Sequence, residues 1–151
     1  MVKYWRELKD TLSNHSIPED DICIVGSFVL SLVGIRDHED IDIMVRSNVE
    51  RPEADHVINL SENIHLVGDD WGKKIGLSND EIIDNNNYHV YYDGIKVVKL
   101  GLLLATKLER RTAKDLRDIA LMTEVMIGDP YSRINGVTTT KRGVLPLRYI
   151  R

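Results

Sequence analysis

Apolar positions along the chain fall partly into short continuous runs and partly into helical repeats, which together predict an α+β fold. Short apolar runs bounded by turn residues predict strands at residues 22–25, 40–45 and 64–67. An apolar segment from Phe28 to Val33 stops at Gly34 and predicts a short helix between the first two strands. An amphipathic helix is predicted over residues 3–14, where apolar side chains recur at helical spacing at Tyr4, Trp5, Leu8 and Leu12.

The second half of the chain predicts a hairpin followed by two helices. Two β-rich runs, 88–92 and 95–98, flank Asp93-Gly94, a pair that favours a type I′ turn. One helix is predicted at about 100–111, and Leu108 is expected to pack it on the core. The next is predicted at about 113–126, and the residues expected on its inner face are Leu116, Ile119, Ala120, Thr123 and Met126 or Ile127.

Polar groups from both ends of the strand–helix–strand unit at residues 22–45 are expected to meet in one place. Asp40 and Asp42 are two residues apart on a strand, so they project to the same face and repel each other unless a cation neutralises them. Such a carboxylate pair suits Mg²⁺, which fills its other positions with water and substrate phosphate. Gly26-Ser27 lies where the first strand turns into the helix, and a glycine there lets the backbone approach a phosphate closely.

A second group of charged residues lies in the stretch from Lys107 to Asp118. We expect Leu108 and Leu116 to hold this stretch to the core, with its basic side chains on the exposed side. A fixed cation near the β and γ oxygens of a triphosphate stabilises charge that moves onto departing pyrophosphate. The residues expected to contact the nucleotide here are Lys107, Arg110 and Lys114, with Asp115 and Asp118 orienting them.

These two stretches resemble a known family. Gly26-Ser27, twelve intervening residues and then Asp40-x-Asp42 between apolar neighbours resembles the defining motif of the nucleotidyltransferase superfamily, the polymerase-beta-like fold. The hairpin and the later Lys-Asp-x-x-Asp pattern are similar to small bacterial nucleotidyltransferases of the abortive-infection type, which include toxins of toxin–antitoxin pairs. The resemblance covers most of residues 22–126. It implies an α+β nucleotidyltransferase fold in which a small mixed sheet carries Gly-Ser and Asp-x-Asp and is flanked by helices.

The resemblance also implies an activity, the Mg²⁺-dependent transfer of a nucleoside monophosphate from an NTP, ATP among them, to an acceptor hydroxyl. Asp40 and Asp42 are then the metal ligands and catalytic residues, and the Lys107 and Lys114-Asp115 positions bind nucleotide. The acceptor stays open between an RNA or tRNA end, a protein side chain and a small alcohol or sugar phosphate. A partner protein and a homodimer also stay open.

The sequence departs from the family pattern at one position. Active members usually carry a third carboxylate on a later strand, and neither run of the predicted hairpin has an acid in its interior. His89 shares a face with Tyr91 and is the candidate for that position, as a base in place of the carboxylate; the alternative is a histidine that only packs within the strand. Two alternatives therefore remain: a catalytically inactive relative that binds nucleotide or regulates a partner, and a phosphotransferase of surface-polysaccharide synthesis.

Length and composition fit one domain over residues 1–151 with a basic C-terminal arm at 130–151. The chain is 42% hydrophobic and 29% charged, and its one cysteine, Cys23, lies in an apolar run. The absence of disulfide pairs, of a signal-peptide pattern and of a membrane-length apolar run predicts a cytoplasmic protein with no membrane partner.

The net charge of −4 is unevenly distributed along the chain. Residues 1–129 carry −9, from 15 basic and 24 acidic residues, whereas the last 22 carry +5. The acidic body argues against broad nonspecific nucleic-acid binding. The basic arm is expected to lie over the protein's own acidic face, with a polynucleotide contact as the alternative.

Overall fold

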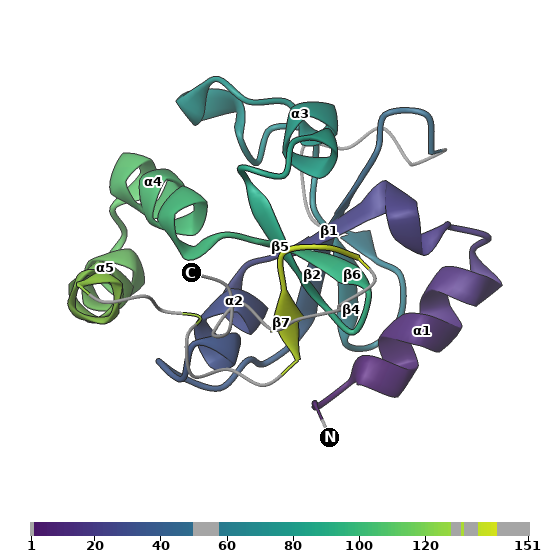
Figure 1. Ribbon diagram of the computed structural model, residues 1–151, viewed down its shortest axis with the longest axis horizontal. Helices are drawn as coiled ribbons and strands as arrows, with labels where there is room; N and C mark the ends of the chain where they lie inside the picture. The colour runs from purple at the N-terminus through teal and green to yellow at the C-terminus, as the bar shows by residue number, and fades with distance from the viewer. Residues whose placement is uncertain (1, 50–57, 128–130, 132–135, 142–151) are drawn as a thin grey trace.

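A seven-stranded mixed sheet forms the centre of the computed structural model, which describes residues 2–49, 58–127, 131 and 136–141 (Figure 1). The strands lie in the order β3-β4-β2-β1-β6-β5-β7. Their bounds are β1 Ile22–Val25, β2 Ile41–Val45, β3 Ile58–Asn59, β4 Ile64–Leu66, β5 His89–Tyr92, β6 Ile95–Val98 and β7 Val137–Thr138. The helices are α1 Trp5–Asn14, α2 Ser27–Leu32, α3 Asn79–Asp84, α4 Leu100–Arg110 and α5 Ala113–Met126, with short 3-10 turns η1 Glu19–Asp21 and η2 Lys73–Ile75.

Strand register brings Gly26, Asp42 and His65 together at one part of this sheet. β1 and β2 are antiparallel with Val25 opposite Asp42, so Gly26, one residue further on, lies beside that carboxylate. β4 runs parallel to β2 and places His65 next to Asp42. β6 runs parallel to β1 on its other side. The mixed sheet with flanking helices confirms the α+β prediction.

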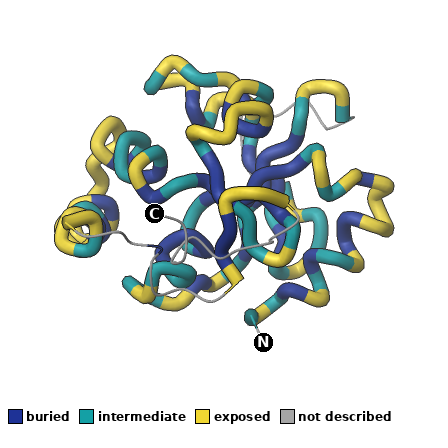
Figure 2. Tube along the Cα trace, viewed as in Figure 1, coloured by how far each residue is buried: buried dark blue, intermediate teal, exposed yellow. Residues whose placement is uncertain are grey.

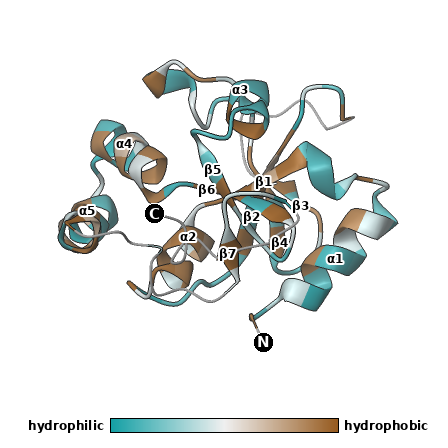
Figure 3. Ribbon diagram, in the orientation of Figure 1, coloured by the Kyte–Doolittle hydropathy of each residue, from teal (hydrophilic) through white to brown (hydrophobic). Residues whose placement is uncertain are grey.

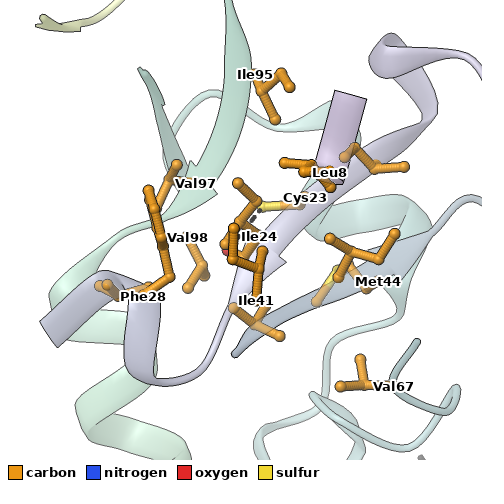
Figure 4. Packing of buried hydrophobic residues seen from close by; sticks show 14 of the residues in the cluster. Leu8, Cys23, Ile24, Phe28, Ile41, Met44, Val67, Ile95, Val97 and Val98 are labelled. Atoms are coloured by element: carbon orange, nitrogen blue, oxygen red, sulfur yellow. Dashed lines mark hydrogen bonds between the residues drawn. The ribbon is translucent and has the colours of Figure 1, made fainter. Parts of the chain in front are cut away.

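Apolar side chains cover both faces of the central strands. All four residues of β1 are buried, and α2 and α3 both contact β1 and β2, which lie between these two helices (Figures 1 and 2). The packing around Cys23 and Ile24 includes Phe28 from α2, Ile41 and Met44 from β2, and Val97 and Val98 from β6 (Figure 4). Burial therefore removes the sequence's longest apolar runs from water, which is the main favourable contribution to folding.

The local predictions for α1 and the hairpin are confirmed. In α1, Trp5, Leu8 and Leu12 are buried, and the Trp5 ring stacks on Phe28 with ring centroids 5.7 Å apart. Asp93 and Gly94 have φ values of 47° and 76°, and the type I′ turn requires positive φ at both positions. The Trp5 indole Nε1 donates a 2.7 Å hydrogen bond to the Asp93 carboxylate, which fastens α1 to this turn.

The inner face predicted for α5 is wrong. Its buried residues are Asp115, Asp118 and Met122, whereas Leu116 is 56% exposed and Ile127 is 87% exposed. Figure 2 shows the exposed side of α5 facing away from the sheet, and Figure 3 shows hydrophobic residues on that helix. In α4, Leu108 is likewise exposed while Lys107 is buried. The physical reason is that Asp115 and Asp118 form ion pairs with Lys107, Arg110 and Arg36, so the polar face of the helix pair can be the inner one.

The C-terminal arm contributes one short strand to the sheet. Its described part includes β7, which pairs with β5, and Lys141, which forms an ion pair with Asp20. The other basic residues of the arm, Arg133, Arg142, Arg148 and Arg151, lie outside the described residues. Among the helices that the structure describes, none has the length and apolar character needed to cross a membrane.

Candidate functional site

An open cleft with a volume of about 710 Å³ lies between the end of the β1–β2 unit and the α4–α5 pair. This volume is within the range of roughly 300–1,000 Å³ that is typical of small-molecule sites. Sequence-predicted residues contribute to its lining from three places: Gly26-Ser27, Asp40 with Asp42, and a basic set of Lys107, Arg110 and Lys114. The structure therefore brings together the two stretches that were singled out in the sequence.

Gly26 and Asp42 are in close contact at one wall of the cleft. Gly26 adopts φ +73° at the start of α2, a conformation that side chains disfavour. A Cβ added to Gly26 would lie 2.5 Å from the Asp42 Oδ2 atom. Only glycine lets the turn and the carboxylate occupy this arrangement together.

We predict that Gly26→Ala damages this wall. The methyl group must displace the Asp42 carboxylate and also strain the positive-φ backbone, at a combined cost of about 1–3 kcal/mol. Urea unfolding should show that loss as a lower free energy of unfolding. Gly34→Ala is the matched control, because Gly34 also has positive φ (+80°) but a Cβ added there would meet nothing within 4 Å. Equal losses of stability in the two variants would contradict the role of the Gly26–Asp42 contact.

A third potential ligand, His65, faces the two aspartates. Asp40 immediately precedes β2 and Asp42 lies within it, and ligand atoms of Asp40, Asp42 and His65 all lie within 4.8 Å of one another. The His65 Nδ1 atom is 3.4 Å from Asp40 Oδ2 and 3.6 Å from Asp42 Oδ1. His65 was not among the site residues predicted from the sequence. The available signal was its position as the lone polar residue in the middle of an apolar strand, the same signal that marked Asp42.

The Asp42 carboxyl is electrostatically strained. Burial, with a smaller effect from the neighbouring Asp40 charge, raises the pKa of Asp42 to about 6, and attraction to His65 only partly opposes this shift. Ionising such a carboxyl group costs free energy when no cation is near. A cation close to it stabilises the charged form and removes that cost. Asp42 is therefore suited to hold a cation and costs the protein stability without one.

Three cationic side chains of the cleft are held in place by two buried carboxylates. Lys107 Nζ lies 3.1 Å from Asp118 and 3.4 Å from Asp115. Arg110 donates two 2.7 Å hydrogen bonds to Asp115, and Arg36 donates bonds of 3.1 and 3.2 Å to Asp118. Three positive and two negative groups leave this network with a net charge of +1, and Lys114 adds another cation to the cleft lining.

Asp115 and Asp118 themselves do not line the cleft. Hydrogen bonds from Arg110 and then Thr112 lower the pKa of Asp115 despite its burial. Burial opposes the ionisation of Asp118, but hydrogen bonds from Arg36 and Lys107 outweigh it and its pKa is also lowered. Asp115 was expected both to orient the basic residues and to belong to the nucleotide site. Its carboxylate accepts hydrogen bonds from Arg110 and Lys107, as the first expectation requires, and its hydrogen bonds with Thr112 cap the start of α5.

His89 is not placed in the site. β5 is separated from β2 by β1 and β6, and His89 is absent from the cleft lining. Its ring is buried, with Nδ1 2.9 Å from the Ile82 carbonyl oxygen, and burial lowers its pKa. The proposed substitution of His89 for a third carboxylate therefore does not fit this fold. The strands next to β2 are β1 and β4, and β4 places His65 beside Asp42.

Two further basic residues of the cleft, Lys73 and Lys74, were not predicted. They belong to η2, which is in contact with α4, and Trp71 lies nearby in the same lining. Their sequence signal was weak because the surrounding stretch has the composition of an ordinary polar turn.

Comparisons of this chain with protein-family models, with curated proteins and with solved structures found no match.

Proposed function

We propose that this chain transfers a nucleoside monophosphate from an NTP to an acceptor hydroxyl, and that its sheet belongs to the nucleotidyltransferase fold. The observation that carries this proposal is the meeting of Asp40 and Asp42 with three anchored cations in one cleft. A metal–triphosphate has both charges: its cation needs carboxylate ligands, and its phosphates need basic partners. The Gly-Ser turn and the Asp-x-Asp spacing support the same assignment.

The donor set in the cleft fits a divalent cation. Asp40 and Asp42 offer carboxylate oxygens, and the glycine at position 26 leaves the Asp42 carboxylate the space that any side chain there would take. Mg²⁺ is the cation indicated by the carboxylate pair in the sequence. When bound, such a cation would neutralise phosphate charge and polarise the phosphorus centre that is attacked.

The cationic residues supply the remaining electrostatic stabilisation. Arg36, Lys107 and Arg110 are anchored by carboxylates behind them, so they offer positive charge to phosphate oxygens without first having to be ordered. Lys114 is exposed and meets the phosphates from the first turn of α5. In this arrangement the protein acts by positioning and by charge stabilisation, which is how phosphoryl-group chemistry is generally catalysed.

A second candidate function is nucleotide binding without turnover. The observation that favours it is His65, which stands beside Asp42 where a third acid would complete an all-carboxylate site. A protein of this kind would use the same cleft to sense nucleotide and to regulate a partner. The two functions differ in whether the nucleotide is transferred to an acceptor, so the test has to look for a labelled acceptor.

The decisive experiment incubates the protein with α-labelled ATP, CTP, GTP and UTP in turn, against total RNA, cell protein and sugar phosphates, with Mg²⁺ and separately with Mn²⁺. We expect one nucleotide to label one class of acceptor, with release of pyrophosphate. Asp40→Asn/Asp42→Asn is the matched inactive variant and should reduce labelling by about 10³-fold or more.

Thermal stabilisation by each NTP is measured in parallel. Stabilisation that is lost in the double variant, without any labelled acceptor, would support the binding module. Absence of both effects would overturn the assignment of the cleft to nucleotides.

A further inference from the structure

We propose that His65 is the third protein ligand of the cation site and that it makes the site prefer a first-row transition-metal ion such as Mn²⁺ over Mg²⁺. This inference rests on the proposed function only in placing a cation at Asp40 and Asp42. It goes beyond that function by naming a residue that no sequence motif marked and by specifying the class of metal.

The geometry of the three side chains fits one ion. Two ligand atoms that each bind a metal at about 2.1 Å lie roughly 3.0–3.4 Å apart in octahedral or tetrahedral coordination. The His65 Nδ1 atom is 3.4 Å from Asp40 Oδ2 and 3.6 Å from Asp42 Oδ1, close to that separation. The two nitrogen–oxygen separations therefore exceed that range by no more than about 0.2 Å, and ligand atoms of all three residues lie within 4.8 Å of one another.

The backbone around His65 holds it in this place. His65 and Asp42 are paired in the parallel β2–β4 ladder, so their side chains project from the same face of the sheet. The turn before β4 is tied to α1, because Glu7 accepts hydrogen bonds from the Asn63 backbone N–H (2.8 Å), the Asn63 side chain (2.9 Å) and the Ser61 hydroxyl (2.5 Å). The imidazole is presented to the aspartates by two fixed elements rather than by a loose loop.

The two oxygens of Asp42 have different surroundings. Oδ2 lies against Gly26, where a Cβ would approach to 2.5 Å, while Oδ1 is the atom nearest the His65 ring. Asp42 is thereby oriented with one oxygen toward His65. A simple surface ion pair between Asp42 and His65 would not need this orientation of the carboxylate. It would therefore not need a glycine at position 26 to leave space for Oδ2.

The type of ligand determines the choice of metal. Mg²⁺ is a hard ion that binds oxygen and retains several waters, and a neutral imidazole nitrogen is a poor substitute for a carboxylate. Transition-metal ions accept imidazole and carboxylate together, and their affinity for such mixed sites rises along the series that begins with Mn²⁺. One imidazole with two carboxylates therefore shifts the site away from Mg²⁺ and still leaves positions open for water and phosphate oxygens.

The test measures metal binding alone, with no nucleotide and no assay of turnover. Metal-free protein is titrated with MnCl₂ while free Mn²⁺ is followed by electron paramagnetic resonance, and Mg²⁺ is then added as a competitor. We expect wild-type protein to bind Mn²⁺ at least about 10-fold more tightly than Mg²⁺. His65→Ala should weaken Mn²⁺ binding by about 10–100-fold, the range seen when a metal site loses a supporting group.

His65→Asp is the second variant, because it restores an all-oxygen donor set. It should bind Mg²⁺ more tightly than wild type does and should reduce the Mn²⁺ preference to less than about 3-fold. His15→Ala is the matched control: His15 is exposed, its Nε2 lies 3.3 Å from the Leu60 carbonyl oxygen, and it is outside the cleft lining. Its replacement should leave Mn²⁺ affinity unchanged. Circular dichroism melts of all variants establish that they are folded.

Unchanged Mn²⁺ affinity in folded His65→Ala, or equal wild-type affinity for Mn²⁺ and Mg²⁺, would overturn the inference. In that case the contact of His65 with the aspartates is only an ion pair. These outcomes are independent of the proposed function, since nucleotidyl transfer with Mg²⁺ remains open if His65 is not a ligand. Conversely, a Mn²⁺ preference that depends on His65 would support this inference even if no NTP labels any acceptor.

Discussion

Asp42→Asn is expected to make the protein more stable while eliminating cation binding. Burial raises the pKa of Asp42 from its ordinary value of 3.8 to about 6, so keeping this carboxyl ionised at neutral pH costs the folded state about 3 kcal/mol. The carboxamide carries no charge and avoids this cost. For a domain of this size the gain corresponds to a rise of roughly 6–12 °C in Tm. The same change removes a proposed metal ligand, so the proposed transfer activity should fall by about 10³-fold or more.

The stability difference between the two proteins should depend on pH in a defined direction. The folded-state pKa lies above the unfolded one, so wild-type protein loses stability through this group as the pH rises from about 4 to about 6. Asp42→Asn does not titrate in that window. Its advantage should therefore be small at pH 4 and complete by pH 7.

Urea unfolding in the presence of EDTA, at pH 4, 5, 6 and 7, measures this difference. Glu39→Gln is the matched control, since Glu39 is an exposed carboxylate that lines the same cleft, and it should change the free energy of unfolding by less than about 0.5 kcal/mol. If Asp42→Asn is no more stable than wild type at pH 7, then the carboxylate is not electrostatically strained. A saturating divalent cation should reverse the order by stabilising wild-type protein alone.

Lys107→Met is expected to destabilise the fold by about 3 kcal/mol. Lys107 is only 5% exposed and forms ion pairs with two buried carboxylates, Asp115 and Asp118. Removing one partner of a buried ion pair typically costs about 3–5 kcal/mol because the remaining charge is left uncompensated. The lower end applies here, since Arg110 and Arg36 still pair with the two carboxylates.

The control for this variant is Lys114→Met, which removes a lysine from the lining of the same cleft without touching the buried network. Lys114 is exposed, so its replacement should change stability by less than about 0.5 kcal/mol and should weaken the proposed NTP binding instead. Urea unfolding of both variants, and of Lys107→Met combined with Asp118→Asn, separates the roles. The second substitution should recover part of the loss by removing a stranded charge. Equal stability of the two lysine variants would show that Lys107 is not part of a buried network.

Local features of the fold were predictable from the sequence because they depend on neighbouring residues. The Asp93-Gly94 turn follows from the backbone conformations that those two residues tolerate. The cap at Ser78 is likewise local: its hydroxyl accepts a hydrogen bond from the Glu81 backbone N–H, and the Glu81 side chain accepts one from the Ser78 backbone N–H. The meeting of Gly26 with Asp42 was also within reach, because a short strand–helix–strand unit brings its two ends together.

The orientation of the helix pair could not be read in the same way. The apolar residues of α5 recur at helical spacing and predicted that Leu116 would face inward, as hydrophobicity normally decides. In the fold, the inward residues are Asp115 and Asp118, since Lys107, Arg110 and Arg36 reach them from other segments. Whether a charged face can be buried depends on partners that are distant in the sequence, and helical periodicity contains no information about them.

The sequence by itself determined where most helices and strands form, and it singled out four residues that line one half of the cleft: Gly26, Ser27, Asp40 and Asp42. Only the tertiary structure decided which other residues lie beside these four. Sheet order placed His65 beside Asp42 and put His89 on β5, beyond β1 and β6. The physical reason is that elements arise from local backbone and side-chain preferences, whereas the neighbours of a strand are chosen by the packing of the whole chain.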